Sequence, residues 1–239
     1  MMRNWTRKLA GPMVAAGAFA LLTSVPATAW QAARSNFASL VTRGVGGSHI
    51  LGNPAAPTRL VEYVSYTCPH CAHFTAESAA LLRARYIRPG AVSVEIRHIV
   101  RDPVDMAMAA AANCGAASRF FSRHEALMAQ QSAILARVQA LPPATLQAWG
   151  GGEATTRLRR VADDSGVSAW MRLRGFTPLQ INSCLADVSL QNRLVAMTNA
   201  GTAAGVNGTP MFALNDVLLP GVYSWAALSP PLAAAAARR

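Results

Sequence analysis

Two cysteines three residues apart, Cys68 and Cys71, offer the most specific chemistry in this sequence of 239 residues. They follow an almost continuously apolar run, Leu60 to Tyr66, and Pro69 stands directly after the first cysteine. If this run is a buried strand followed by a helix, the first sulfur lies at a helix N-terminus, where unpaired N–H groups and the helix dipole stabilise a thiolate. The arrangement predicts disulfide exchange, with Cys68 as the nucleophile and Cys71 as the resolving thiol.

The two residues between the cysteines are expected to tune this chemistry. Pro69 suits the first turn of a helix, and His70 can donate a hydrogen bond or supply positive charge to the Cys68 thiolate. A lower thiol pKa stabilises the reduced form of the pair, which makes its disulfide a stronger oxidant.

Other chemistry is conceivable for the same residues. Four nearby side chains could be proposed as zinc ligands, but their crowding within six residues departs from the usual two separated ligand pairs: Cys68, His70, Cys71 and His73. A purely structural disulfide is a second alternative, although its place at the end of a buried strand argues against it. Haem attachment is excluded because Ala72, not histidine, follows the second cysteine. We expect a redox-active disulfide with no metal and no other cofactor.

The elements that position these cysteines fall into two groups. Strand and helix patterns near the cysteines and near the C-terminus occupy these ranges: strands at 49–51, 60–66, 91–100, 211–214 and 217–219, and helices at 69–86 and 223–237. Strand 60–66 is apolar on both faces, as in a buried parallel sheet, and strands 211–214 and 217–219 are spaced as a hairpin. The last helix contains Pro230 and Pro231, where an interruption is expected.

Between these groups the chain has only helical patterns, from residue 102 to residue 204. Asp102 followed by Pro103 suits the start of a helix that runs through Cys114. Thr177 and Gln180 are spaced as a capping box, which opens a helix that carries Cys184. An insertion made only of helices therefore interrupts the strands.

The first 29 residues have the order of an export signal. A cationic start is followed by an apolar run, Gly11 to Val25, and by Ala27-Thr28-Ala29, whose small residues suit a signal peptidase. We predict cleavage after Ala29 and an exported, periplasmic protein. An uncleaved anchor is the alternative, although the run has only about 15 residues where a membrane span needs roughly 20.

The composition is that of a core-forming protein. With 52% hydrophobic and 14% charged residues, the chain is not disordered. Three cationic residues belong to the predicted leader, and their removal lowers the formal charge from +11 to +8. Arginines at 83, 85 and 88 and at 157, 159 and 160 form clusters without interleaved aromatic residues. These clusters indicate solvated helix faces, and we expect no nucleic-acid partner.

The segment from Leu60 through Cys-Pro-His-Cys to Cys71, together with the later Gly-Thr-Pro at 208–210, resembles the DsbA family of periplasmic thiol:disulfide oxidoreductases. The resemblance runs from about His49 to Leu228. It implies an α/β thioredoxin fold with an inserted all-helical domain. The expected boundaries are: leader 1–29, N-terminal arm 30–48, thioredoxin-like domain 49–101 and 205–239, and helical domain 102–204.

The resemblance also assigns three residues outside the cysteine motif. Pro210 would be a cis-proline facing the active-site disulfide, and the backbone of Thr209 would pair with an extended substrate segment. Glu62 matches the buried acid of the family, which handles the proton of the resolving thiol. An acid in an apolar strand is costly to bury, and the alternative is a Glu62 at a strand end that reaches solvent.

The second cysteine pair, Cys114 and Cys184, is expected to be structural, because neither residue has a neighbouring arrangement suited to exchange. A disulfide between them would close a loop of about 70 residues and stabilise the fold by roughly 4 kcal/mol in the chain-entropy model. The alternative is two separate buried thiols.

By this resemblance the protein would oxidise reduced exported proteins through a mixed disulfide and be reoxidised by a membrane quinone reductase of the DsbB type. The arm at 30–48 is too short for the dimerisation domain of typical isomerases, which favours a monomeric oxidase. Two alternatives remain: a disulfide isomerase or reductase of the same fold, and a peptide-binding chaperone module.

Overall fold

A mixed β-sheet forms the centre of the protein. The structure, a computed structural model, describes residues 36–237, with the side chains of residues 154 and 155 left aside. The strand order is β1-β2-β4-β3-β5-β6, with these bounds: β1 Val41–Arg43, β2 His49–Leu51, β3 Thr58–Val64, β4 Val92–His98, β5 Met211–Leu214 and β6 Val217–Leu218. β3 runs parallel to β4 and antiparallel to β5. The strand that leads to the cysteines is therefore central.

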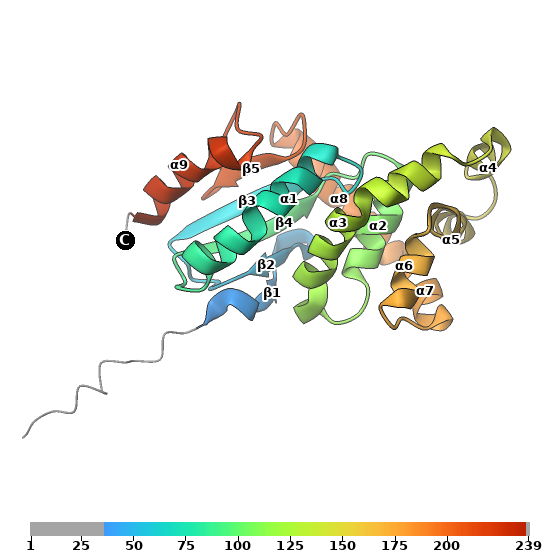
Figure 1. Ribbon diagram of the computed structural model, residues 1–239, viewed down its shortest axis with the longest axis horizontal. Helices are drawn as coiled ribbons and strands as arrows, with labels where there is room; N and C mark the ends of the chain where they lie inside the picture. Colours follow the sequence, from blue (N-terminus) through green and yellow to red (C-terminus); the bar gives the residue numbers. More distant parts are fainter. Residues whose placement is uncertain (1–35, 238–239) are drawn as a thin grey trace, which may run out of the picture. The chain divides into compact units, whose positions relative to one another are not determined.

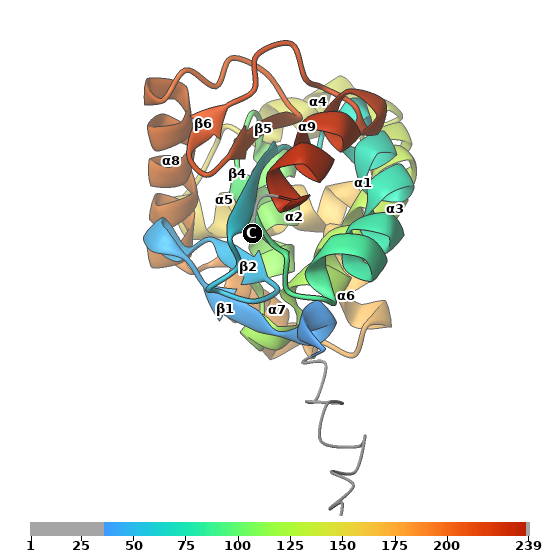
Figure 2. The same ribbon diagram turned by 90° about the vertical axis from the view of Figure 1, so that its left-hand side faces the viewer.

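Helices cover both faces of this sheet. α1 (Pro69–Leu82) continues into a π turn at Arg83–Ile87, and it lies with α3 (Phe120–Gln139) on one side of the sheet, whereas α8 (Val188–Ala203) lies on the other (Figures 1 and 2). α9 (Trp225–Ala237) contacts α1 and β5. The remaining helices gather beyond one end of the sheet (Figure 1): α2 Pro103–Asn113, α4 Pro143–Ala148, α5 Ala154–Ser165, α6 Val167–Leu173 and α7 Pro178–Leu185.

Local capping explains where several of these helices begin. Asp102 caps α2 by accepting a hydrogen bond from the backbone N–H of Asp105. Thr177 and Gln180 form the reciprocal capping box at the start of α7. The expected hairpin is also present, because Asn215 and Asp216 have positive φ angles of 48° and 68° between β5 and β6. The prediction of a thioredoxin fold with a helical insertion is confirmed.

The sheet and the inserted helices share one hydrophobic core. Leu60 and Val64 on β3 belong to the same buried cluster as Phe120 on α3 and Trp170 on α6. Alternate residues of β3 point to the opposite face, where Val61 and Tyr63 form a smaller cluster with Val206, Met211 and Ala213. The insertion is thus packed against the strand that leads to Cys68.

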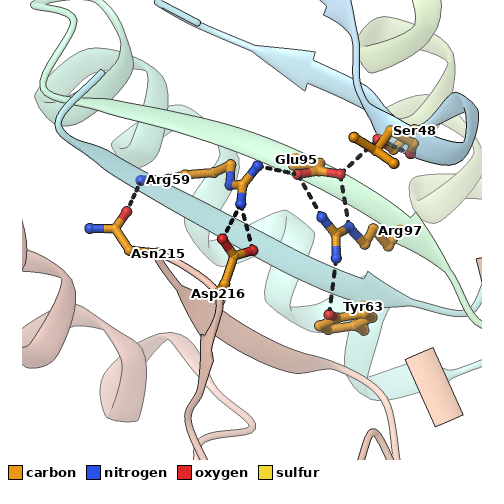
Figure 3. A network of polar contacts seen from close by, with 8 residues as sticks. Ser48, Arg59, Tyr63, Glu95, Arg97, Asn215 and Asp216 are labelled. Atoms are coloured by element: carbon orange, nitrogen blue, oxygen red, sulfur yellow. Dashed lines mark hydrogen bonds and ion pairs between the residues drawn. The ribbon is translucent and has the colours of Figure 1, made fainter. Parts of the chain in front are cut away.

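A polar network occupies part of the face that carries Tyr63 (Figure 3). Glu95 on β4 is 1% exposed and accepts hydrogen bonds from Ser48 Oγ at 2.7 Å and Arg97 Nε at 2.8 Å. Arg59 lies 3.7 Å from the same carboxylate and also pairs with Asp216 beyond β5. These contacts connect β3, β4, the hairpin turn and Ser48, the residue before β2, so the buried charge of Glu95 is compensated.

The structure differs from the sequence-based expectations in several places. The strand expected at 60–66 spans 58–64, because Ser65 and the backbone of Tyr66 bond the side chain of Asp105 instead of a neighbouring strand. Residues 41–43, within the expected arm, form edge strand β1, which is too short to produce a visible period in the sequence. α2 ends at Asn113 rather than Cys114, because the backbone turns there and Gly115 adopts a φ of +78°. α9 continues through Pro230 and Pro231 without interruption, although each proline lacks the N–H donor of a helical hydrogen bond.

The predicted leader at 1–29, its cleavage after Ala29, and the first residues of the expected arm lie outside the described residues. Within residues 36–237, no helix has both the length and the apolar character needed to cross a membrane.

Candidate active site

Cys68 is the residue that joins β3 to α1. It has an extended backbone and serves as the N-cap of α1, with Pro69 as the first helical residue. Its Sγ lies 3.1 Å from the carbonyl oxygen of Thr209, which accepts a hydrogen bond from Cys68 when the thiol is protonated. Cys68 is 3% exposed, whereas Pro69 and His70 beside it are exposed. The sulfur therefore lies just beneath the exposed surface that Pro69 and His70 form.

Several donors favour the thiolate form of Cys68. A hydrogen bond from the Cys71 thiol is the main cause that lowers the Cys68 pKa, from 9.0 to about 5. Burial of the sulfur opposes this effect, while the Thr209 side chain and the backbone N–H groups of Cys71 and His70 add to it. Cys68 is therefore ionised at neutral pH.

Cys71 has the opposite environment, one turn inside the helix. It is 0% exposed, and burial raises the pKa of its thiol far above the ordinary value. The hydrogen bond to Cys68 acts in the same direction, as does Glu62 at pH values at which its carboxyl is ionised. The dithiol thus consists of one thiolate and one thiol that keeps its proton.

Glu62 lies on the face of β3 that α1 covers. It is 4% exposed, which rules out a strand-end side chain that reaches solvent, and burial raises the pKa of its carboxyl to about 8. Its Oε1 has no hydrogen-bond partner among the described residues. The carboxyl faces a narrow cavity that is also lined by Thr75 and Ser78 of α1 and by His124 of α3. A neutral, protonated acid is therefore held close to Cys71.

The loop before β5 brings a distant part of the chain to the cysteines. The Thr209–Pro210 peptide bond is cis, and Thr209 directs its carbonyl oxygen at Cys68 Sγ. The residues expected from the sequence to form the site, Cys68, Cys71, Thr209 and Glu62, are thus gathered around the start of α1. The His70 side chain points to solvent, and His70 acts on Cys68 through its backbone N–H.

Cys114 and Cys184 lie apart from this site, in the helical insertion. They are joined by a disulfide with Cα atoms 5.6 Å apart, which connects the end of α2 to α7.

Sequence reasoning missed the side chains of the insertion that hold the loop of Cys68. Asp105 of α2 is buried and accepts hydrogen bonds from Ser65 Oγ at 2.6 Å and from the Tyr66 backbone N–H at 2.8 Å. His124 of α3 lies 3.0 Å from the Tyr66 hydroxyl, and Gln131 of the same helix bonds the loop backbone. Polar residues on buried helix faces were the available signal, but their partners lie about 40 to 65 positions away and no local pattern connects them.

Within the described residues, no group of three or more His, Cys, Asp or Glu side chains could hold a metal ion.

Comparison with known proteins agrees with this geometry. The family model described as thioredoxin matches residues 45–232. This chain belongs to the thioredoxin family. Among relatives, this thioredoxin-family protein is 28% identical over 170 residues to a Rickettsia bellii protein named as a protein-disulfide oxidoreductase, with 70% of this chain and 57% of that protein covered. The chain therefore spans a little over half the length of this curated relative.

Two solved structures resemble this thioredoxin-family protein over most of its length. A structure described as protein-disulfide isomerase from Novosphingobium aromaticivorans is 40% identical, with a TM-score of 0.77 over 80% of this chain and 98% of that one. The α-DsbA1 protein of Wolbachia pipientis is 17% identical and shares the fold, with a TM-score of 0.64 over 81% of this chain and 93% of that one. The family is thus shown to be thioredoxin, and the resemblance to a DsbA-type protein is confirmed at the level of the fold.

Proposed function

We propose that this protein is a thiol:disulfide oxidoreductase that acts chiefly as an oxidase and donates its Cys68–Cys71 disulfide to exported proteins. The observation that carries the proposal is the unequal ionisation of the two thiols, with a Cys68 pKa of about 5 and a raised Cys71 pKa. A stabilised Cys68 thiolate favours the reduced enzyme, so the disulfide gives up its oxidising equivalents readily.

In the first step a substrate thiolate attacks Cys68 Sγ of the disulfide. A substrate–Cys68 bond forms, the Cys68–Cys71 bond breaks, and its electron pair goes to Cys71 Sγ. Cys71 then takes a proton, for which the neutral Glu62 carboxyl, with a pKa of about 8, is a suitable donor. The products are a mixed disulfide and a resolving thiol that stays protonated.

In the second step another substrate thiolate attacks the substrate sulfur of the mixed disulfide. The substrate gains a disulfide, and Cys68 leaves as a thiolate, which is a good leaving group because its pKa is low. The enzyme ends with two more electrons and is reduced. The Thr209 backbone next to Cys68 would hold the extended substrate by strand addition, with Pro210 shaping that loop.

The proposal includes the cellular setting. The leader pattern supports export to the periplasm, where reduced exported proteins would be the substrates and a DsbB-type membrane quinone reductase would restore the disulfide. The enzyme would work as a monomer, without a further cofactor. Recovery of a periplasmic protein whose N-terminus is Trp30 would support the cleavage site, and retention of the first 29 residues on a membrane would contradict it.

The direction of exchange is tested by the redox potential of the cysteine pair together with oxidation of a reduced model protein. An oxidase should have a potential well above the roughly −270 mV of thioredoxin and should oxidise the substrate stoichiometrically. A potential near that of thioredoxin with no substrate oxidation would overturn the oxidase assignment.

Isomerisation is a second candidate, favoured by the isomerase name of the 40%-identical structure. An isomerase would use the reduced Cys68 to attack wrong disulfides, so it would restore activity to a scrambled, fully oxidised substrate. Replacement of Cys68 by serine separates both activities from a chaperone role, since only peptide holding would survive that change.

A further inference from the structure

The short segment between β3 and α1, residues 65–68, is held from outside by the helical insertion. Side chains of α2, α3 and the α2 N-cap bond its backbone or hydroxyl groups: Asp102, Asp105, His124 and Gln131. Of these, Gln131 reaches the nucleophile itself. Its Nε2 donates to the Tyr66 carbonyl at 2.7 Å and to the Cys68 carbonyl at 2.9 Å.

We propose that Gln131 is a positioning residue that fixes the backbone of Cys68 and thereby sets the acidity and reactivity of its thiol. The inference rests on the proposed role of Cys68 as the nucleophile, but it holds for oxidation and isomerisation alike.

The geometry of the amide supports this role. One amide nitrogen carries two hydrogens, and both carbonyls lie within hydrogen-bond distance of it, on either side of Thr67. Gln131 is 3% exposed, and its amide would be costly to bury without these partners. The bonds tie the segment on both sides of Thr67 to the middle of α3.

The position of the Cys68 carbonyl matters because the same residue begins α1. That carbonyl also accepts the first helical hydrogen bonds, from the backbone N–H of Cys71 at 3.1 Å and of Ala72 at 3.3 Å. A fixed carbonyl keeps the Cys68 sulfur against the N–H groups of His70 and Cys71, which lower its pKa. Without the Gln131 bonds, the N-cap residue gains freedom and these donors lose their alignment.

The insertion therefore has a role in the chemistry as well as in the core. Through Gln131, a helix that contributes no reacting atom restrains the residue that does.

The test is the Gln131→Met variant, which keeps the length and volume of the side chain and removes both donors. We expect the midpoint of the pH dependence of Cys68 alkylation by iodoacetamide to rise by about 0.5 to 1 pH unit, and alkylation at pH 5.5 to slow by about 1.5- to threefold. Gln130 is its exposed neighbour on the same helix, and the Gln130→Met variant should leave the profile unchanged.

Two results would overturn the proposal. One is a folded Gln131→Met protein that is less stable but whose Cys68 profile is unchanged, since Gln131 would then be merely structural. The other is an equal shift in the Gln130→Met variant. If Gln131→Met does not fold, Gln131→Asn replaces it, because the shorter amide keeps a donor but cannot reach both carbonyls. An unshifted profile in folded Gln131→Asn would likewise overturn the proposal.

Failure of the proposed function is detected separately. It would appear as full activity of Cys68→Ser or as a potential near that of thioredoxin, and neither result depends on Gln131.

Discussion

At the scale of single residues, the two sulfurs at the start of α1 have opposite ionisation although they lie three residues apart. We expect alkylation of the reduced protein at Cys68 to titrate with a midpoint near pH 5, whereas an ordinary cysteine titrates near 9. Cys71 should stay unreactive throughout, because burial raises its pKa. Mass-mapped iodoacetamide labelling between pH 3.5 and 8 measures both. The Cys71→Ala variant removes the main hydrogen bond to Cys68 and should raise the midpoint; an unchanged midpoint would contradict this cause.

Glu62 is the second residue whose environment makes a measurable prediction. Its folded-state pKa of about 8 exceeds the value of 4.5 for an unburied carboxyl, so the folded state binds more protons than the unfolded state between these values. Its contribution to stability is complete below about pH 4.5 and is lost as the pH rises through 8. Glu62→Gln removes this dependence. The free energy of unfolding of Glu62→Gln minus that of wild type should therefore be about 3 kcal/mol more positive at pH 8 than at pH 5.

Urea unfolding of both reduced proteins at the two pH values tests this difference. Glu77 is an exposed acid on α1, so Glu77→Gln is the matched control and should track wild type. If Glu62→Gln also tracks wild type, Glu62 is ionised in the folded protein and cannot be the proton donor to Cys71.

At the scale of elements, the Cys114–Cys184 disulfide fixes α7 to the end of α2. The residues are 70 positions apart, and a loop of that length corresponds to about 4 kcal/mol in the chain-entropy model. We expect the Cys114→Ala/Cys184→Ala double variant to lose about that much in urea unfolding. Its Cys68 alkylation midpoint should match wild type, because the bridge does not touch the loop of Cys68. A shifted midpoint would show that the bridge also acts on the active site.

Elements whose signals are local could be predicted from the sequence. The cap at Asp102, the capping box at Thr177 and Gln180, and the turn at Asn215–Asp216 each depend on residues within four positions, and each is present. Edge strand β1 was not predicted, since three residues cannot display a period of two.

Residues that meet through the tertiary fold escaped prediction for a different reason. Gln131 and Asp105 contact a loop about 40 to 65 residues earlier in the chain, and nothing in the pattern of α2 or α3 marks that loop as their partner. Glu62, Thr209 and Pro210 were identified through family resemblance, which carries such long-range information.

At the scale of the whole molecule, the interface between the sheet and the insertion contains an unusual number of buried ionisable groups. His49 of β2 stacks on Phe120 of α3 at 3.8 Å between ring centroids, and His98 and His124 also contact that ring. Burial lowers their pKa values to about 3, 4 and 3, respectively. Coulombic repulsion from Arg43 and among the histidines acts in the same direction at His49.

The buried histidines and the buried acids respond to pH in opposite ways. The unfolded histidines take up protons below about pH 6.5 while the folded ones stay neutral, so their contribution to stability is lost as the pH falls. Glu62, with a pKa of about 8, and Asp105, with a pKa raised by burial to about 6, bind protons first in the folded state and offset that loss. Once the unfolded acids are also protonated, near pH 4, the offset stops growing. Between pH 7 and 5 the two acids offset about two thirds of the histidine loss, so the free energy of unfolding should fall by only about 2 kcal/mol.

Below about pH 4.5 we expect the free energy of unfolding to fall steeply, because the histidine contribution continues to decline without compensation. In this range each buried histidine lowers the free energy of unfolding by at most about 1.4 kcal/mol per pH unit. His49→Phe keeps the aromatic stack on Phe120 and removes one titrating group, so its loss between pH 4.5 and 3.5 should be smaller by about 1 kcal/mol. His73 is exposed, and His73→Phe should lose as much as wild type. Equal losses of the free energy of unfolding between pH 4.5 and 3.5 in wild type and His49→Phe would mean that His49 takes up its proton in the folded state. The burial of His49 would then not be a cause of acid unfolding.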